Sequence, residues 1–304
     1  MRRNQSTKRI QKENRTPMES ERITEKNKTE KGVLYLVATP IGNLSDISER
    51  ALKVLSEVDF VAAEDTRNSA KLLSCYGISK PMISYHQHNR AERGPVICDR
   101  LVSGESCALI TDAGTPAISD PGEDLVKLCA ERGIKVSFIP GACAAIMALA
   151  LSALPTGRFA FEGFVSGTKS ERKQRFTAVA KDDRTLIFYE APHRLRSTLA
   201  EMLEVFGDRP ITLCRELTKL NEEIIRTTLN SAVNLYETTD PRGEYVLILQ
   251  GETAPAEGAE FWRDMTPRQH VEYYMEQGQD KNSAIKSAAK DRGVHKSEIY
   301  KQVL

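Results

Sequence analysis

Short apolar runs alternate with helix-like segments from residue 33 to about residue 152 of the chain. A strand buried in a parallel sheet is typically a short continuous apolar run, whereas a surface helix repeats its apolar positions every third or fourth residue. On this criterion, strands are predicted at residues 33–38, 59–63, 82–85, 107–111 and 135–139. The alternation of strands with helices predicts a mostly parallel sheet covered by helices on both faces.

A second set of strands follows a break at residues 152–157, where serine, proline and glycine indicate a crossing between domains. These strands are predicted at residues 159–165, 185–189, 211–215, 223–228 and 244–249. Only a short helix at residues 230–237 separates the last two strands, so this sheet is expected to be mixed. The predicted fold class is α/β, with an N-terminal αβα domain at residues 32–152 and a C-terminal αβα domain at residues 153–252.

The two ends of the chain differ from these domains in composition. Residues 1–31 are basic and almost devoid of apolar side chains, which predicts a disordered tail that solubilises the protein or weakly tethers RNA. This segment lacks the continuous apolar stretch of a secretory signal peptide and therefore does not resemble one. Residues 253–304 are predicted to form a linker and a helix-turn-helix-like module. Ala289, Gly293 and Ile299 have the spacing of the small residue at the helix crossing, the glycine in the turn and the apolar anchor beneath the second helix. The module is basic. It is expected either to contact nucleic acid or to be a small helical packing domain with solvated lysines.

Composition narrows the class of protein. The chain has 304 residues and a net charge of +1, so no global basic field indicates binding to nucleic acid. No apolar run is long enough to cross a membrane. The six cysteines include no C-x-x-C pair and lie mostly in apolar segments, which predicts reduced thiols in a cytoplasmic protein. The five histidines are scattered, and no metal site is expected.

Three loops rich in proline and glycine follow predicted strands, at residues 39–47, 111–122 and 140–145. Open α/β sheets hold their ligands at the carboxyl ends of strands, so these loops are candidates for one ligand site. The chain contains neither G-x-G-x-x-G nor G-x-x-x-x-G-K-[ST]. A nicotinamide coenzyme or a nucleoside triphosphate is therefore not indicated.

Four motifs in order, at residues 37–44, 64–67, 112–122 and 215–219, resemble those of the tetrapyrrole methylases, the class III S-adenosylmethionine methyltransferases. Within that family they look like the branch that methylates the ribose 2′-hydroxyl of a cytidine in the decoding region of 16S rRNA. The resemblance covers roughly residues 32–252. It implies two αβα domains with S-adenosylmethionine in the cleft between them. It also implies a homodimer acting on 16S rRNA or the small ribosomal subunit, with no membrane partner.

The resemblance also assigns binding residues. Those expected to hold the cofactor are Pro40, Asp112, Ala113, Gly114, Thr115, Ile118, Cys143, Ala144, Tyr189 and Gly243. Those expected to contact the substrate are Arg67, His88, Asn89, His193, Arg194, Arg215 and Glu216. Arginine suits phosphate contacts because its guanidinium presents several fixed donors. A cation at a helix start opposes the helix dipole, which favours a substrate-facing role for His193 and Arg194.

Attack by a ribose hydroxyl benefits from a general base, because the hydroxyl ionises far above neutral pH. Asp65, just beyond the predicted strand at residues 59–63, is the first candidate, and its neighbour Glu64 is the second. Lys219 would serve only if burial lowered its pKa. Two other functions are weighed: methylation of a small tetrapyrrole, and ligand sensing by a nucleic-acid-binding protein. The charged motifs at residues 64–67 and 215–219 favour RNA, since a porphyrin trough would need more apolar loops.

Overall fold

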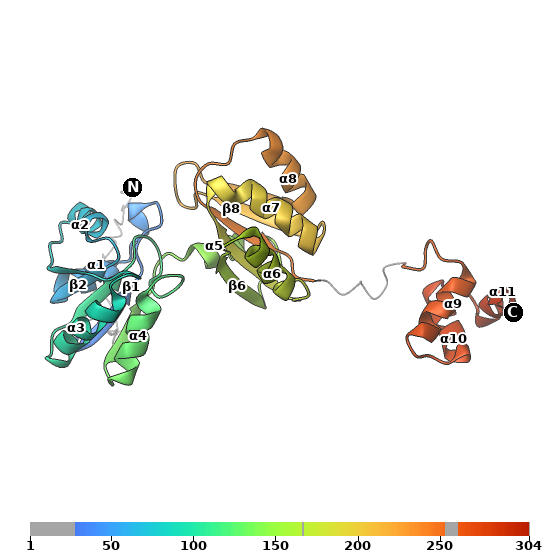
Figure 1. Cartoon of the computed structure of the whole chain (residues 1–304), viewed down its shortest axis with the longest axis horizontal. Helices are drawn as coiled ribbons and strands as arrows, with labels where there is room; N and C mark the ends of the chain where they lie inside the picture. Colours follow the sequence, from blue (N-terminus) through green and yellow to red (C-terminus); the bar gives the residue numbers. More distant parts are fainter. Residues whose placement is uncertain (1–27, 166, 253–260, 304) are drawn as a thin grey trace, which may run out of the picture. The chain divides into compact units, whose positions relative to one another are not determined.

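The computed structural model describes residues 28–165, 167–252 and 261–303 (Figure 1). Contacts divide the chain into two units, which are described separately. The first runs to Pro40 and continues over Leu44–Ala142, and the second comprises Ile41–Asn43 and the residues from Cys143 onward. Residues 1–27 of the predicted tail and residues 253–260 of the predicted linker lie outside the described residues.

The first unit contains a five-stranded parallel sheet of order β3-β2-β4-β1-β5, as the alternating pattern predicted. Its strands are β1 (Val33–Val37), β2 (Phe60–Ala63), β3 (Met82–Ser84), β4 (Cys107–Ile110) and β5 (Lys135–Ile139). Its helices are η1 (Leu44–Asp46), α1 (Glu49–Glu57), α2 (Thr66–Cys75), α3 (Arg90–Val102) and α4 (Gly122–Glu131).

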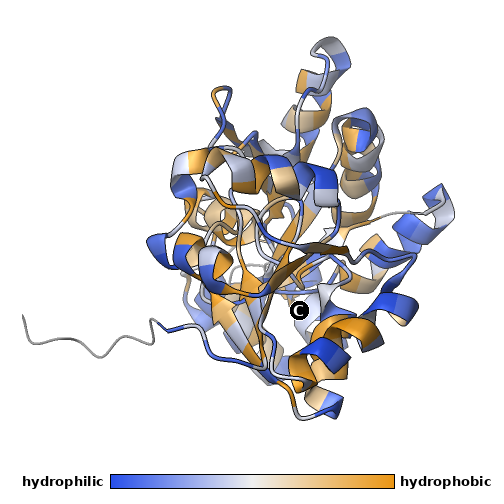
Figure 2. Cartoon of the chain, turned by 90° about the vertical axis from the view of Figure 1, so that its left-hand side faces the viewer, coloured by the Kyte–Doolittle hydropathy of each residue, from blue (hydrophilic) through white to orange (hydrophobic). Residues whose placement is uncertain are grey.

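Two apolar cores cover the two faces of this sheet. Val54 and Leu55 of α1 and Leu73 of α2 pack on one face, and residues of α3 and α4 such as Ile97 and Leu125 pack on the other. Strand side chains point alternately to the two faces, so a strand buried on both sides must be apolar throughout. Figure 2 shows the corresponding colouring, with apolar strands inside and hydrophilic outer faces on the helices.

The second unit contains a mixed sheet of order β6-β7-β10-β8-β9. Only the β6–β7 pair is parallel, and the other three pairs are antiparallel, as the short connection between the last two strands indicated. The strands are β6 (Phe159–Phe164), β7 (Thr185–Glu190), β8 (Pro210–Arg215), β9 (Glu223–Thr228) and β10 (Tyr245–Leu249). The helices on this sheet are α5 (Ala144–Leu151), α6 (Lys169–Val179), α7 (Pro192–Phe206) and α8 (Leu229–Thr238).

The boundary between the units differs from the predicted one at residues 152 and 153. Ala145, Ala148 and Leu149 of α5 pack with Ile187 and Ile248 of the second sheet, so the division falls after Ala142. Helix α5 is apolar on every side, and its sequence therefore gives no sign of which sheet it covers.

The first unit also begins earlier than predicted. Thr29, assigned to the tail, donates a hydrogen bond from its hydroxyl to Glu57 at 2.6 Å. The backbone N–H of Glu30 donates to the hydroxyl of Tyr35 at 2.7 Å. Residues 29 and 30 are therefore anchored to the first unit.

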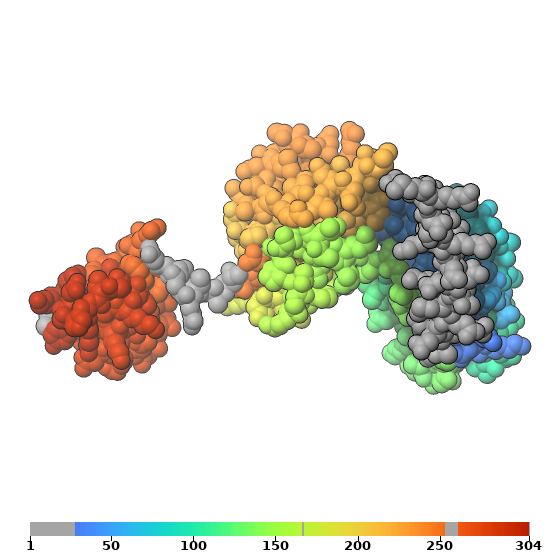
Figure 3. Space-filling view, turned by 180° about the vertical axis from the view of Figure 1, so that it is seen from behind, coloured from blue at the N-terminus to red at the C-terminus, as the bar shows by residue number. Residues whose placement is uncertain are grey.

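Residues 261–303 form a body of three helices, seen in red in Figure 3. The helices are α9 (Pro267–Glu276), α10 (Lys281–Asp291) and α11 (Lys296–Val303). Ala289 and Ile299 are buried in their shared core, and Gly293 turns the chain between α10 and α11 with φ +64°. Within the described part of the chain, no helix is both long and apolar enough to span a membrane.

Candidate active site

Backbone hydrogen bonds join the loops at the carboxyl edge of the first sheet. Thr39, after β1, and Gly114, after β4, exchange two N–H to carbonyl bonds of 2.9 and 3.1 Å. The hydroxyl of Thr115 donates to the carbonyl of Ala142, beyond β5, at 2.9 Å. The three loops that the sequence singled out are thus parts of one rim in this unit.

The loop between β4 and α4 has an unusual backbone. Ala117 and Ser119 have φ values of 66° and 62°, and Gly114 has φ 81°. Left-handed conformations cost free energy at residues other than glycine, and such strain is concentrated at functional sites. Ile118, between the two strained residues, is 46% exposed. The loop therefore presents backbone groups and an apolar side chain outward.

Asp120 holds this loop in shape, a role that the sequence analysis did not assign. Its carboxylate accepts hydrogen bonds from the backbone N–H of Ala117 at 2.9 Å and of Gly122 at 2.6 Å. Burial raises the pKa of Asp120 although these bonds oppose the rise. An aspartate directly before Pro-Gly is a typical turn-forming signal, and it could have identified this residue.

Glu64 lies at the same edge, just beyond β2. The hydroxyl of Thr111, just beyond β4, donates to its carboxylate at 3.2 Å. Desolvation by burial raises the pKa of Glu64, and the neighbouring negative charges of Asp112 and Asp120 add to the rise. A half-buried carboxylate with a raised proton affinity is a suitable proton acceptor at this rim.

Asp65, the first candidate for the base, has a different environment. It caps α2, accepting hydrogen bonds from the backbone N–H of Arg67 at 2.8 Å and of Asn68 at 3.4 Å. These bonds lower its pKa, which makes the carboxylate a weaker base. The structure therefore favours Glu64 over Asp65 for proton transfer.

The other predicted residues of this unit differ in accessibility. The Arg67 side chain is 88% exposed. His88 is exposed, whereas Asn89 binds its own loop by accepting from the N–H of His86 at 2.8 Å and donating to the carbonyl of Ser84 at 3.1 Å. Arg67 pairs with Asp65 at 3.5 Å but remains accessible to a substrate, as does His88, and the side chain of Asn89 shapes the loop.

In the second unit, Lys219 lies in a compact ionic cluster after β8. Its ammonium contacts the carboxylates of Glu216 and Glu244, each at 2.9 Å. Burial alone would lower the pKa of Lys219, but these two carboxylates outweigh that effect and raise it. The condition set for Lys219 as a base is not met, because it is held as a cation.

Backbone geometry around this cluster is tightly specified. Glu216 and Thr218 have φ values of 51° and 65°. A Cβ atom at Gly243 would lie 2.5 Å from Cγ of Glu216, and one at Gly42 would lie 2.3 Å from Cγ of Lys219. Both glycines therefore leave room for the ionic cluster. Arg215 pairs with Glu223 on β9 at 3.1 Å.

Tyr189 on β7 and the start of α5 pack together on the face of the second sheet that α5 covers. The backbone N–H of Ala145 donates to the Tyr189 hydroxyl at 3.2 Å, and burial raises the pKa of this tyrosine to about 12. Cys143 is the cap residue of α5, and Ala144 is its first residue. Both are half-buried, whereas Pro40 in the first unit is buried.

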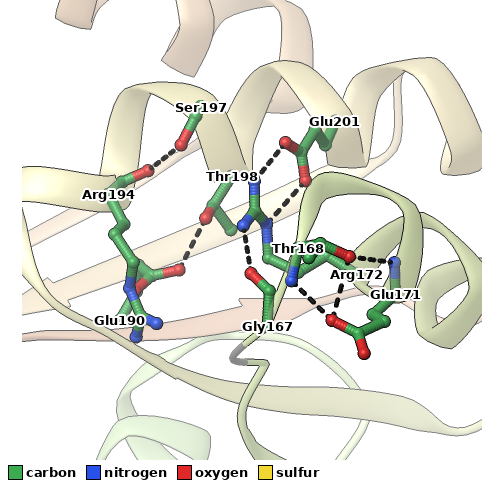
Figure 4. A network of polar contacts seen from close by, with 9 residues as sticks. All are labelled: Gly167, Thr168, Glu171, Arg172, Glu190, Arg194, Ser197, Thr198 and Glu201. Carbon is green, nitrogen blue, oxygen red and sulfur yellow. Dashed lines mark hydrogen bonds and ion pairs between the residues drawn. The ribbon is translucent and has the colours of Figure 1, made fainter.

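Arg194 is held by a buried carboxylate (Figure 4). Its Nε donates to Glu190 at 2.9 Å, and the same carboxylate accepts from the hydroxyl of Thr198 at 2.6 Å. The Glu190 side chain is only 1% exposed. Glu190 thus compensates the positive charge of Arg194 at the start of α7. His193, the other predicted cation there, is exposed.

Comparison with known proteins gives matches over most of the chain. The family model of the tetrapyrrole (corrin/porphyrin) methylases matches residues 33–233. Proteins named ribosomal RNA small subunit methyltransferase I are similar in sequence. The one from Halalkalibacterium halodurans is 47% identical over 89% of this chain and 94% of its own, and the one from Bacillus subtilis is 45% identical over 90% and 94%. The one from Haemophilus influenzae is 51% identical over 73% and 79%.

Solved structures share the fold at low sequence identity. A diphthine synthase has a TM-score of 0.57 at 19% identity, covering 73% of this chain and 90% of that one. The cobalamin biosynthetic enzyme cobalt precorrin-4 methyltransferase has a TM-score of 0.54 at 18% identity, covering 72% and 95%. A uroporphyrin-III C-methyltransferase from Thermus thermophilus, solved with S-adenosyl homocysteine, has a TM-score of 0.50 at 18% identity, covering 71% and 96%.

Proposed function

Because the chain belongs to the tetrapyrrole (corrin/porphyrin) methylase family, we propose that it is an S-adenosylmethionine-dependent methyltransferase acting on RNA of the small ribosomal subunit. The observation that carries the proposal is the likeness to the named rRNA methyltransferases, which extends over about nine tenths of both chains. The rim of the first unit supports it, because it combines a loop of fixed backbone shape with a carboxylate suited to proton transfer.

The proposed acceptor is the ribose 2′-hydroxyl of a cytidine in the decoding region of 16S rRNA. When bound, S-adenosylmethionine supplies a methyl group on a cationic sulfur, and the C–S bond breaks as the new C–O bond forms. Because the positive charge is lost in this step, the residues of the site mainly orient the two reactants. Glu64 is proposed to accept the proton of the hydroxyl, with Thr111 holding its carboxylate in place.

The rim suits the donor molecule. The loop after β4 offers shaped backbone and the exposed apolar Ile118, which fits an adenosine and a methionine chain better than a polyphosphate. We assign the primary contacts to residues of this rim: Pro40, Asp112, Ala113, Gly114, Thr115 and Ile118. The second-unit contacts Cys143, Ala144, Tyr189 and Gly243 rest on the resemblance alone.

The exposed Arg67, His88 and His193 are proposed to meet RNA directly. Arg215 is proposed to contact phosphate, and the Glu216–Lys219 pair is proposed to hold the loop after β8 in position beside it. We also propose that the protein forms a homodimer and is located in the cytoplasm.

Methyl transfer to purified small ribosomal subunits that lack their native methylations tests the function. With labelled S-adenosylmethionine and nuclease mapping, we expect label on the ribose of a single cytidine in the decoding region. Label on a base, or in another region of the RNA, would show that the acceptor is a different group from the one proposed. If no label enters RNA while the cofactor still binds, the proposal is wrong, and tetrapyrrole substrates are the next to assay.

Substitution of Gly42 by alanine is expected to lower kcat/KM for small subunits about tenfold and to lower the free energy of unfolding by about 1.5 kcal/mol. The new methyl group would overlap Cγ of Lys219 and displace its ammonium from Glu216 and Glu244. Loss of charge-assisted contacts of this kind is worth about 1.5 kcal/mol or more, which is roughly a factor of ten.

The matched control for this variant is Gly157→Ala, because a Cβ atom at Gly157 meets no atom within 4 Å. We expect its kcat/KM to equal that of the unaltered protein. If Gly42→Ala retained full activity, the position of Lys219 would have no part in the reaction.

A further inference from the structure

Five lysines on α10 and α11 are available to an anionic partner. They are Lys281, Lys286, Lys290, Lys296 and Lys301, all exposed. None of them forms an ion pair with residues 28–165, 167–252 or 261–303. This differs from α6, where Lys173 pairs with Glu204.

The acidic side chains of these two helices and their caps are already engaged. Asp280 caps α10 and accepts from the hydroxyl of Ser283 at 2.6 Å. Asp291 accepts hydrogen bonds from His270 and Tyr274 within the core of the three helices, and Glu298 of α11 accepts from the backbone N–H of His295 at 3.4 Å. Because these carboxylates are directed to internal partners, they do not neutralise the lysines.

Arg292 is a cation of the same three-helix body that has a structural role. Its Nε donates to His270 at 3.1 Å, and its guanidinium donates to the carbonyl of Met265 at 2.5 Å and lies 5.0 Å from the Trp262 ring centre. The five lysines have no such internal contacts among the described residues. Packing therefore accounts for Arg292 but not for the lysines.

The lysines also lie on the outer faces of their helices. Lys286 and Lys290 are one turn apart on α10, away from its buried residues Ala284 and Ala288. On α11, Lys296 is one turn before Tyr300, which is 44% exposed. An exposed aromatic ring among unpaired lysines is the combination that binds single-stranded nucleic acid, through phosphate contacts and base stacking.

We propose that the exposed side chains of α10 and α11 bind the substrate RNA, with Lys286 and Lys290 on phosphates and Tyr300 stacked on an unpaired base. The inference rests on the proposed function, because it takes the bound nucleic acid to be the RNA that is methylated. It assigns the body at residues 261–303 to substrate capture and leaves the chemistry to the rim of the first unit.

The test uses the full-length chain with the double variant Lys286→Gln/Lys290→Gln. Loss of two phosphate contacts is expected to weaken binding to single-stranded RNA by about 10- to 50-fold at 0.1 M salt, and to reduce the slope of log K against log salt by about 1.5. The KM for small subunits should rise while kcat at saturating subunits stays unchanged. Tyr300→Leu should weaken RNA binding at least about fivefold without altering the salt slope.

Lys169→Gln/Lys173→Gln is the matched control, because it removes two exposed lysines at the same spacing from α6. We expect it to change neither the RNA affinity nor the salt slope. Equal losses in both double variants, or no loss in the α10 variant, would overturn the inference. Either result leaves the proposed function intact as long as the unaltered chain methylates RNA, whereas absence of that methylation refutes the function itself.

Discussion

Replacement of Glu64 by glutamine is expected to lower kcat for methyl transfer by about 10²- to 10⁴-fold, the usual contribution of a positioned general base. Glutamine retains the size of the side chain and can still accept a hydrogen bond from Thr111, but it cannot take a proton. S-adenosylmethionine affinity and thermal stability should change little. The measurement is single-turnover methyl transfer to small subunits, together with a binding titration of the cofactor.

Asp65→Asn is the matched control for this variant. Asparagine caps helices as well as aspartate does, so α2 keeps its cap while the charge is removed. We expect the Asp65→Asn rate to stay within a few-fold of the unaltered protein. The reverse ranking, with the large loss at Asp65, would return the role of base to that residue.

The pH dependence gives a second readout of the same assignment. Because burial raises the pKa of Glu64, the base is protonated at low pH and the rate should rise with pH through that raised pKa. In Glu64→Gln this limb of the profile should be absent. If the limb persisted unchanged, another group would be responsible for it.

Much of this architecture is predictable from the sequence, because each sheet imposes its own pattern on the chain. A strand such as β4 lies in the middle of a parallel sheet and must be apolar on both faces, which produces the run at Cys107–Ile110. The position of the proposed site follows from the same pattern, since the proline and glycine loops come directly after such strands. Helix α5 was assigned to the wrong unit because it is apolar on every side.

The roles of the site residues were less predictable, because they depend on contacts between distant segments. Glu64 and Asp65 are adjacent in the sequence, yet Glu64 is bound by Thr111 from the loop after β4 and Asp65 caps α2. The state of Lys219 depends on Glu244, which is 25 residues away. A local pattern identifies which residues reach the edge of a sheet, but the proton affinity of each is set by neighbours that only the fold supplies.

The largest effect on stability is expected from the buried pair between Arg172 on α6 and Glu201 on α7 (Figure 4). Two parallel hydrogen bonds of 2.9 and 2.6 Å join the side chains, which are only 14% and 7% exposed, and a further guanidinium N–H donates to the carbonyl of Gly167 at 2.9 Å. Arg172→Met removes one partner and leaves a buried carboxylate uncompensated. The expected cost is about 3 kcal/mol, seen as faster amide hydrogen exchange in α6 and α7.

The neighbouring pair Lys173–Glu204 joins the same two helices but is 52% and 53% exposed, so Lys173→Met should change the exchange rates far less. The double variant Arg172→Met/Glu201→Leu separates two explanations of the large effect. If the cost arises from an orphaned buried charge, an apolar pair of similar volume should restore most of the lost protection. If the double variant is as unstable as Arg172→Met, the paired hydrogen bonds themselves hold α6 against α7, and the desolvation argument fails.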